Sequence, residues 1–177
     1  MKDFLDSWGL TTMVFLPLVG ALVMMLIPKA EEELHKTLAL ITSVAVAVVG
    51  VLVTLNFDWD RSAELQFGVN KTWIEVIKAR YIVGVDGIAM PLILLTLLVV
   101  PLVIIYSWNH FPEPHNPKAF LALVLLLEVG MNGTFVAQDL ILFFIFFEVV
   151  LLPMFFMIGV WGGPNRIYAS IKFFLFT

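Results

Sequence analysis

Glu148 lies near the middle of the apolar run 139–163, which reads DLILFFIFFEVVLLPMFFMIGVWGG and is long enough to cross a bilayer. A charge at this depth costs about 2.5–3.5 kcal/mol on insertion scales. Residues 142–147 and 149–152 are apolar and offer no polar partner in the same helix. Burial favours the neutral carboxyl group, whereas a cation on a neighbouring helix favours the carboxylate. Glu148 is therefore the first candidate for proton or ion handling.

Pro153 follows Glu148 in the same run. Because proline has no N–H, the carbonyl of Val149 loses its helical partner and becomes an acceptor for water or for a partner side chain. The alternative is a structural role, in which Glu148 pairs with another helix and never changes its protonation state.

Glu128 is the second candidate and the weaker one. It lies near the centre of the apolar run 118–137, just before a cluster of small and polar residues at 130–134. Small residues let another helix approach closely, so this cluster is equally compatible with a polar packing face.

Lys172 lies about six residues into the last apolar run, so its long side chain can reach the membrane interface. Its partner cannot be named from the sequence, and a structural role is favoured over a functional one.

The composition predicts an all-α integral membrane protein. Of the 177 residues 61% are hydrophobic and 14% are charged, whereas soluble domains are about 45–50% apolar. The formal net charge of −4 argues against a nucleic-acid partner.

The chain has no cysteine, which excludes thiolate-bound iron–sulfur clusters, disulfides and cysteine zinc sites on it. The three histidines, His35, His110 and His115, all fall in polar linkers, so none is placed to hold a haem between membrane helices. A metal site at 110–115 is disfavoured because the prolines there break any helical ligand spacing. We therefore expect no cofactor on this chain.

Apolar segments predict five full membrane helices, with Asp86 and Asp139 as the N-caps of the third and the fifth. A sixth run is too short to span, so we expect residues 1–177 to form a single transmembrane domain that is the N-terminal part of a longer protein. The predicted helices lie at about 8–27, 37–55, 87–108, 118–137, 139–161 and 166–177, the last of them truncated.

The segment 56–85 is the only long one expected outside the membrane. Its LQFGVN and KARYIVGV stretches predict a hairpin on the membrane surface. Lys and Arg are spread too evenly over the loops to decide the orientation.

Three stretches of the chain resemble the antiporter-like membrane subunits of respiratory complex I. They are VDGIAMPLILLT at 85–96, the run 139–163 and KFFLFT at 172–177. The resemblance implies a fourteen-helix fold with a periplasmic N-terminus in the bacterial inner membrane. It also implies that Glu148 pairs with a lysine on the seventh helix, and that this pair drives proton translocation in NADH–quinone oxidoreductase.

The same resemblance places the flavin, the iron–sulfur clusters and the quinone in partner subunits. The expected partners are the other membrane subunits of complex I, including neighbouring antiporter-like subunits, and the lipid bilayer. Two alternatives stay open: a subunit of a multi-subunit sodium–proton antiporter, and a structural membrane scaffold whose buried charges only fix helix packing.

Overall fold

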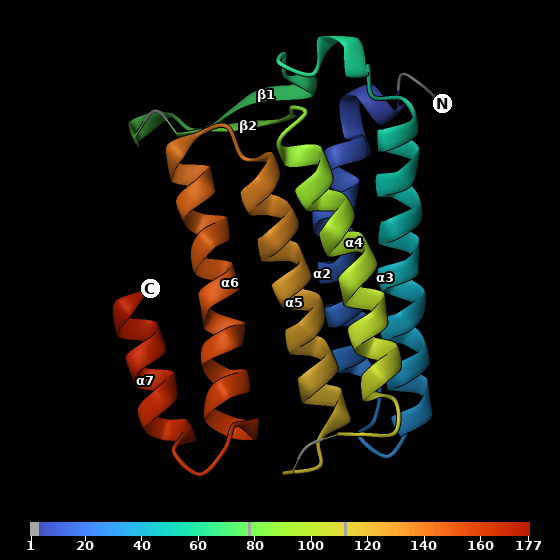
Figure 1. Cartoon of the computed structure of the whole chain (residues 1–177), viewed down its shortest axis with the longest axis vertical. Helices are drawn as coiled ribbons and strands as arrows, with labels where there is room; N and C mark the ends of the chain where they lie inside the picture. The colour runs from blue at the N-terminus through green and yellow to red at the C-terminus, as the bar shows by residue number, and fades with distance from the viewer. Residues whose placement is uncertain (1–3, 78, 112) are drawn as a thin grey trace.

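The computed structural model describes residues 4–77, 79–111 and 113–177, and it is predominantly helical (Figure 1). Five of the described helical segments are long and apolar enough to cross a membrane. The predicted all-α membrane fold is therefore confirmed. The helices are η1 (Leu5–Gly9), α2 (Leu10–Leu26), α3 (Glu32–Leu55), η2 (Trp59–Arg61), η3 (Glu75–Ile77), α4 (Ala89–Ser107), α5 (Pro117–Val136), α6 (Leu140–Trp161) and α7 (Arg166–Phe176).

The start of α3 differs most from the sequence-based boundary. This helix begins at Glu32 rather than near position 37. Glu32 and Glu33 occupy its first turn, where negative charge stabilises the N-terminus of a helix. Lys36 Nζ lies 2.8 Å from a carboxylate oxygen of Glu32 and 2.9 Å from one of Glu33. The acidic stretch therefore forms a helical turn and not a loop.

Helices α2 to α5 pack around a common interior, α6 packs against α5, and α7 packs against α6 (Figure 1). The buried apolar side chains form two clusters. The first lies toward the hairpin and includes Leu10, Met13, Val46, Leu97 and Val129. The second lies toward the opposite end and includes Met24, Ala39, Ile104, Leu121 and Leu125.

The outer faces of the helices are also apolar. On α4, Leu95, Leu98 and Leu102 are 57%, 60% and 54% exposed. Large leucines exposed in rows on a helix that contains no charged residue would not be stable in water. These faces are suited to lipid or to further membrane helices.

The long segment between α3 and α4 forms the predicted hairpin. Strands β1 (Gln66–Ile74) and β2 (Ala79–Val85) pair antiparallel, with Val69 opposite Val83; residue 78 lies outside the described residues. The hairpin crosses one end of the helices (Figure 1). It is joined to the α5–α6 turn by a 2.8 Å hydrogen bond from Gln138 N to the carbonyl of Ile82.

Candidate functional site

Glu148 lies near the middle of α6, on a face that no described helix covers. Its side chain is exposed, and so are Phe144 and Leu152 one turn before and after it, at 59% and 49%. Glu148 makes no hydrogen bond or ion pair with any other described residue. The carboxyl group thus lies on an exposed, apolar face of α6, where a further membrane helix could pack against it.

The opposite side of α6 is fixed by close packing against α5. A Cβ atom on Gly130 would lie 2.8 Å from the backbone nitrogen of Val150, and one on Gly133 would overlap the ring of Phe146. These two glycines let the helix backbones approach closely, as small residues do in membranes. Their contact sets the rotation of α6 and turns Glu148 away from α5.

The start of α6 is fixed by Asp139. Its carboxylate accepts hydrogen bonds from the backbone N–H groups of Ile141 at 2.9 Å and Leu142 at 3.1 Å. Asp86 acts in the same way before α4, accepting from Ile88 N at 3.0 Å and Ala89 N at 2.8 Å. Both aspartates hold helix termini and are not close to Glu148 in the fold.

Pro153 lies inside α6 and is buried. Because it has no N–H, the carbonyl of Val149 has no helical hydrogen-bond partner. This carbonyl belongs to the residue next to Glu148, so the same turn of α6 carries a carboxyl group and a spare acceptor.

Glu128 occupies a different environment from Glu148. It is 0% exposed, on the face of α5 that also buries Leu121 and Leu125. The structure therefore places the two candidate carboxylates in separate sites: Glu128 inside the α2–α5 bundle and Glu148 on the outside of α6.

Lys172 is not brought to Glu148. Helix α7 runs back along α6, with Gly159 beside Ser170 and the rings of Phe155 and Phe174 5.5 Å apart. Glu148 is therefore about two to three turns, or roughly 13 Å, further along α6 than the level of Lys172. The ammonium of Lys172 instead lies 5.7 Å from the centre of the Tyr168 ring.

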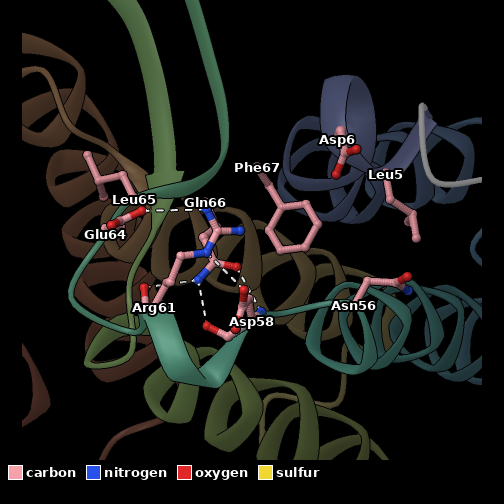
Figure 2. Close-up of a pocket in the computed structure, with 9 residues that line it drawn as sticks. All are labelled: Leu5, Asp6, Asn56, Asp58, Arg61, Glu64, Leu65, Gln66 and Phe67. Carbon is pink, nitrogen blue, oxygen red and sulfur yellow. Dashed lines mark hydrogen bonds and ion pairs between the residues drawn. The ribbon is translucent and has the colours of Figure 1, made fainter.

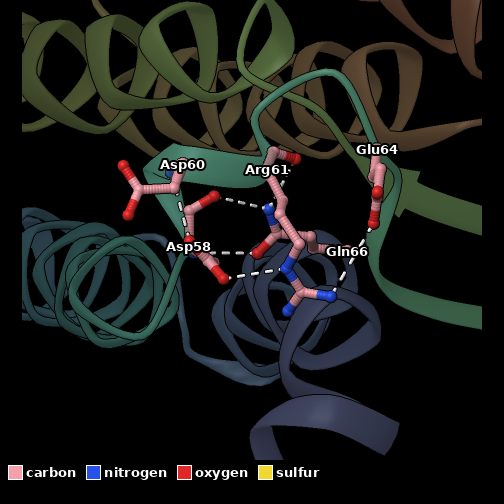
Figure 3. Close-up of polar contacts among 5 residues, drawn as sticks. All are labelled: Asp58, Asp60, Arg61, Glu64 and Gln66. Atoms are coloured by element: carbon pink, nitrogen blue, oxygen red, sulfur yellow. Dashed lines mark hydrogen bonds and ion pairs between the residues drawn. The ribbon is translucent and has the colours of Figure 1, made fainter.

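A polar cluster in the surface segment was not singled out from the sequence. Arg61 Nε donates to Asp58 Oδ2 at 2.8 Å, and its Nη1 lies 3.7 Å from Glu64 (Figure 3). The backbone N–H of Asp58 donates to Gln66 Oε1 at 2.8 Å, and Gln66 Nε2 returns a bond of 2.8 Å to the carbonyl of Asp58. The Arg61 guanidinium holds the pKa of the Asp58 carboxyl below its ordinary value.

This cluster lines a polar pocket of about 370 Å³ that also contains Asp6 and Asn56 (Figure 2). Its charged groups bond mainly to one another, so the cluster stabilises the folded conformation of the loop between α3 and β1. Among the described residues, no group of three or more His, Asp or Glu side chains is arranged to hold a metal ion. In the segment 110–115, where the sequence disfavoured a metal site, Nε2 of His115 lies 3.1 Å from Oε2 of Glu32.

Comparison with known families decides the identity of this fold. A family model described as NADH-ubiquinone oxidoreductase chain 4, amino terminus, matches residues 11–134, most of the chain. The chain belongs to this family. A second model, described as NADH:quinone oxidoreductase/Mrp antiporter, TM, matches residues 137–177. The resemblance to antiporter-like complex I subunits is confirmed.

Individual chain 4 relatives cover nearly all of this chain. It is 39% identical to NAD(P)H-quinone oxidoreductase chain 4 1 of Picosynechococcus over 99% of its length. It is 38% identical to NADH-quinone oxidoreductase subunit M of Rhodobacter capsulatus over 95%, and 36% identical to F(420)H(2) dehydrogenase subunit M of Methanosarcina mazei over 93%. The chain spans about a third of each relative, 32% in all three.

A solved structure shares the chain 4 fold. Respiratory complex I from Thermus thermophilus with bound NADH contains a chain that superposes with a TM-score of 0.77 at 24% identity. The match covers 94% of this chain and 32% of that one. It supports the arrangement of the helices described above.

Proposed function

We propose that the protein containing this chain is a proton-translocating membrane subunit of an NADH–quinone oxidoreductase, and that Glu148 is one of the groups that carry the proton. Family membership supports the first part. The observation that carries the second is the position of Glu148: a carboxyl group at mid-helix that faces away from the bundle and has no partner among the described residues.

In this proposal Glu148 alternates between two states. Surrounded by apolar side chains, it is neutral, because an uncompensated charge there costs several kcal/mol. When a cation on another membrane helix comes within about 4–6 Å, the carboxylate is favoured and the proton leaves. The family resemblance implies that a lysine provides this cation. The exposed face of α6 around Phe144 and Leu152 leaves space for the helix that would carry it.

Electron transfer is assigned to partner subunits. The chain has no cysteine to bind an iron–sulfur cluster. Its relatives are named for different electron donors, NADH, NAD(P)H and F(420)H(2), which suits a subunit that does not itself bind the donor. We expect flavin, iron–sulfur clusters and quinone in partner subunits of a complex I-type assembly in the bacterial inner membrane, with this subunit receiving energy as conformational and electrostatic change.

The test is Glu148→Gln in the complete complex reconstituted into proteoliposomes. Glutamine keeps the size of the side chain but does not titrate, so we expect normal assembly and a lower ratio of protons pumped to electrons transferred. Glu75→Gln, an exposed carboxylate in the surface segment, is the matched control and should leave the ratio unchanged. A normal ratio in the Glu148→Gln complex contradicts the proposal.

The second candidate is a subunit of a sodium–proton antiporter. The model that matches residues 137–177, which include Glu148, is described for both oxidoreductases and Mrp antiporters. Co-purification with flavin and iron–sulfur subunits favours the oxidoreductase. Sodium-driven proton movement without NADH favours the antiporter. If Glu148→Gln impairs assembly but not the proton ratio, the residue has a scaffold role.

A further inference from the structure

The interior of the α2–α5 bundle contains a second polar site. Glu128 and Asn132 are both 0% exposed, and none of their side-chain oxygen or nitrogen atoms has a hydrogen-bond partner among the described residues. They are four residues apart on α5, so their Cβ atoms lie about 5–6 Å from each other on the same face. Two polar side chains without a partner among the described residues therefore share one buried face of α5.

Apolar side chains enclose this site from both ends of the bundle. Leu121 and Leu125, the turns of α5 before Glu128, belong to one hydrophobic cluster. Val129 and Val136, which follow it, belong to the other. Glu128 and Asn132 thus lie where the two clusters meet, at mid-depth of the helices.

No counter-charge reaches this site from the neighbouring helices. Helices α2 and α4 contain no Asp, Glu, Lys, Arg or His. The ionisable residues of α3 all lie within its first five positions. Of these, His35 is buried and Lys36 is paired with Glu32 and Glu33. Lys36 is the fifth residue of α3 and Glu128 is the twelfth residue of α5. Counted from the starts of these helices, Lys36 is therefore about seven residues, or roughly 10 Å, closer to the end of the bundle than Glu128.

The remaining neighbour, α6, also offers no charge to Glu128. Its Glu148 is turned to the exposed face. The buried hydroxyls of Ser43 and Thr96 donate within their own helices, to the carbonyls of Leu40 and Leu92, both at 3.1 Å. They therefore provide no donor that would stabilise a carboxylate.

An ionised Glu128 would be an uncompensated buried charge, which costs several kcal/mol after relaxation. A neutral carboxylic acid removes that cost but still needs partners, since each unsatisfied buried polar group costs about 1–3 kcal/mol. The amide of Asn132 has both a donor and an acceptor. A water molecule between the two side chains would bond to both, as buried waters do with otherwise unsatisfied groups.

We propose that Glu128 and Asn132 form an internal proton-binding site, in which Glu128 is a neutral carboxylic acid bridged to Asn132 by bound water. The ligands are a proton and water. The site is separate from Glu148 and its existence does not depend on the proposed function. A proton released from the Glu128 hydroxyl passes to the water and leaves a carboxylate, and the reverse step restores the acid.

The site can be tested by infrared difference spectroscopy of the complete complex in membranes at neutral pH, in H₂O and in D₂O. The spectrum of the wild type minus that of Glu128→Gln should show the carbonyl stretch of a protonated carboxyl group, shifted by deuterium because water exchanges with it. This subtraction separates the band of Glu128 from that of a neutral Glu148. Glu148→Gln should leave the Glu128 band in place. The infrared band therefore tests the Glu128 site, and the ratio of protons to electrons tests the role of Glu148, independently of each other.

A second variant keeps the proposal falsifiable if Glu128→Gln assembles poorly. Asn132→Leu retains the carboxyl group but removes its hydrogen-bonded neighbour, so the band should persist at a higher frequency. Ser43→Ala, whose hydroxyl bonds within α3, is the control and should not move it. A spectrum without such a band at neutral pH overturns the proposal, and so does loss of the band on adding sodium chloride at constant pH, since that result assigns a metal cation to the site.

Discussion

The ammonium group of Lys118, at the start of α5, donates a hydrogen bond of 2.6 Å to the backbone carbonyl of Ile27, just after the end of α2. It donates a second, of 2.9 Å, to the carbonyl of Met25. The last carbonyls of a helix have no partner within it and carry partial negative charge. Lys118 satisfies two of them and joins two helices that are distant in the sequence.

We expect Lys118→Met to destabilise the protein by about 1 kcal/mol, below the usual range for charged hydrogen bonds because the site is partly exposed. Methionine keeps the length of the side chain but donates no hydrogen bond. Thermal unfolding in detergent measures the change. Lys29→Met is the control, since Lys29 is exposed beside the same helix ends and makes no such bond to another described residue. Equal effects of the two variants would contradict the assigned role.

Gly130 is predicted to be intolerant of any side chain. An added Cβ would lie 2.7 Å from Val150 Cγ2 and 2.8 Å from Val150 N, so the backbones of α5 and α6 would have to separate. Overpacking costs about 1–3 kcal/mol, which exceeds the gain of up to about 1 kcal/mol in helix propensity from glycine to alanine.

Gly130→Ala should therefore lower the unfolding temperature of the detergent-solubilised protein. Gly163→Ala is the matched substitution, because nothing lies within 4 Å of its Cβ position, and it should have little effect. An unchanged unfolding temperature for Gly130→Ala would show that the two helices are not in backbone contact.

Removal of the cap at Asp139 should loosen the start of α6. Asp139→Ala leaves the N–H groups of Ile141 and Leu142 without their acceptor, and loss of such a cap costs about 0.5–2 kcal/mol. Asp139→Asn keeps an acceptor oxygen and should recover most of the loss. Amide hydrogen exchange in the first turn of α6 measures both. Equal exchange in Asp139→Ala and the wild type would exclude a capping role.

The sequence was sufficient to predict features that are determined locally. The apolar runs gave the membrane helices, and Asp139 was recognisable as a cap because the carboxylate immediately precedes such a run. The acidic residues at the start of α3 were assigned to a loop, because the pairing of Lys36 with Glu32 and Glu33 appears only once the helix is formed.

The relative position of Glu128 and Glu148 could not be predicted in the same way. A helix such as α6, which is apolar on nearly every side, has no periodicity to show which face is buried. Packing through Gly130 and Gly133 decides that face, and it directs Glu148 outward. The sequence-based ranking, which favoured Glu148, therefore says nothing about which carboxyl group is more buried, and in the structure it is Glu128.

The surface loop should depend on pH through Asp58. Its folded-state pKa is lowered, mainly by the hydrogen bond from Arg61 and also by the backbone N–H of Asp60. A group with a lowered folded-state pKa stabilises the fold at pH values above its unfolded-state pKa, and this contribution is lost as the pH falls through the folded-state value. Acidification should therefore destabilise the folded conformation of the loop, whereas this conformation should persist at neutral and alkaline pH.

Trp59, whose ring packs edge-on against Phe57 at 4.8 Å, reports on this loop. The fluorescence difference between the wild type and Trp59→Phe isolates its signal, and we expect that signal to change as the pH falls below the ordinary range of an aspartate. In Asp58→Asn the acid-dependent change should disappear, because asparagine does not titrate. Asp60→Asn alters the neighbouring exposed carboxylate, which makes no side-chain bond among the described residues, and should retain the wild-type transition. If Asp58→Asn also retained it, the titrating group would have to be another residue.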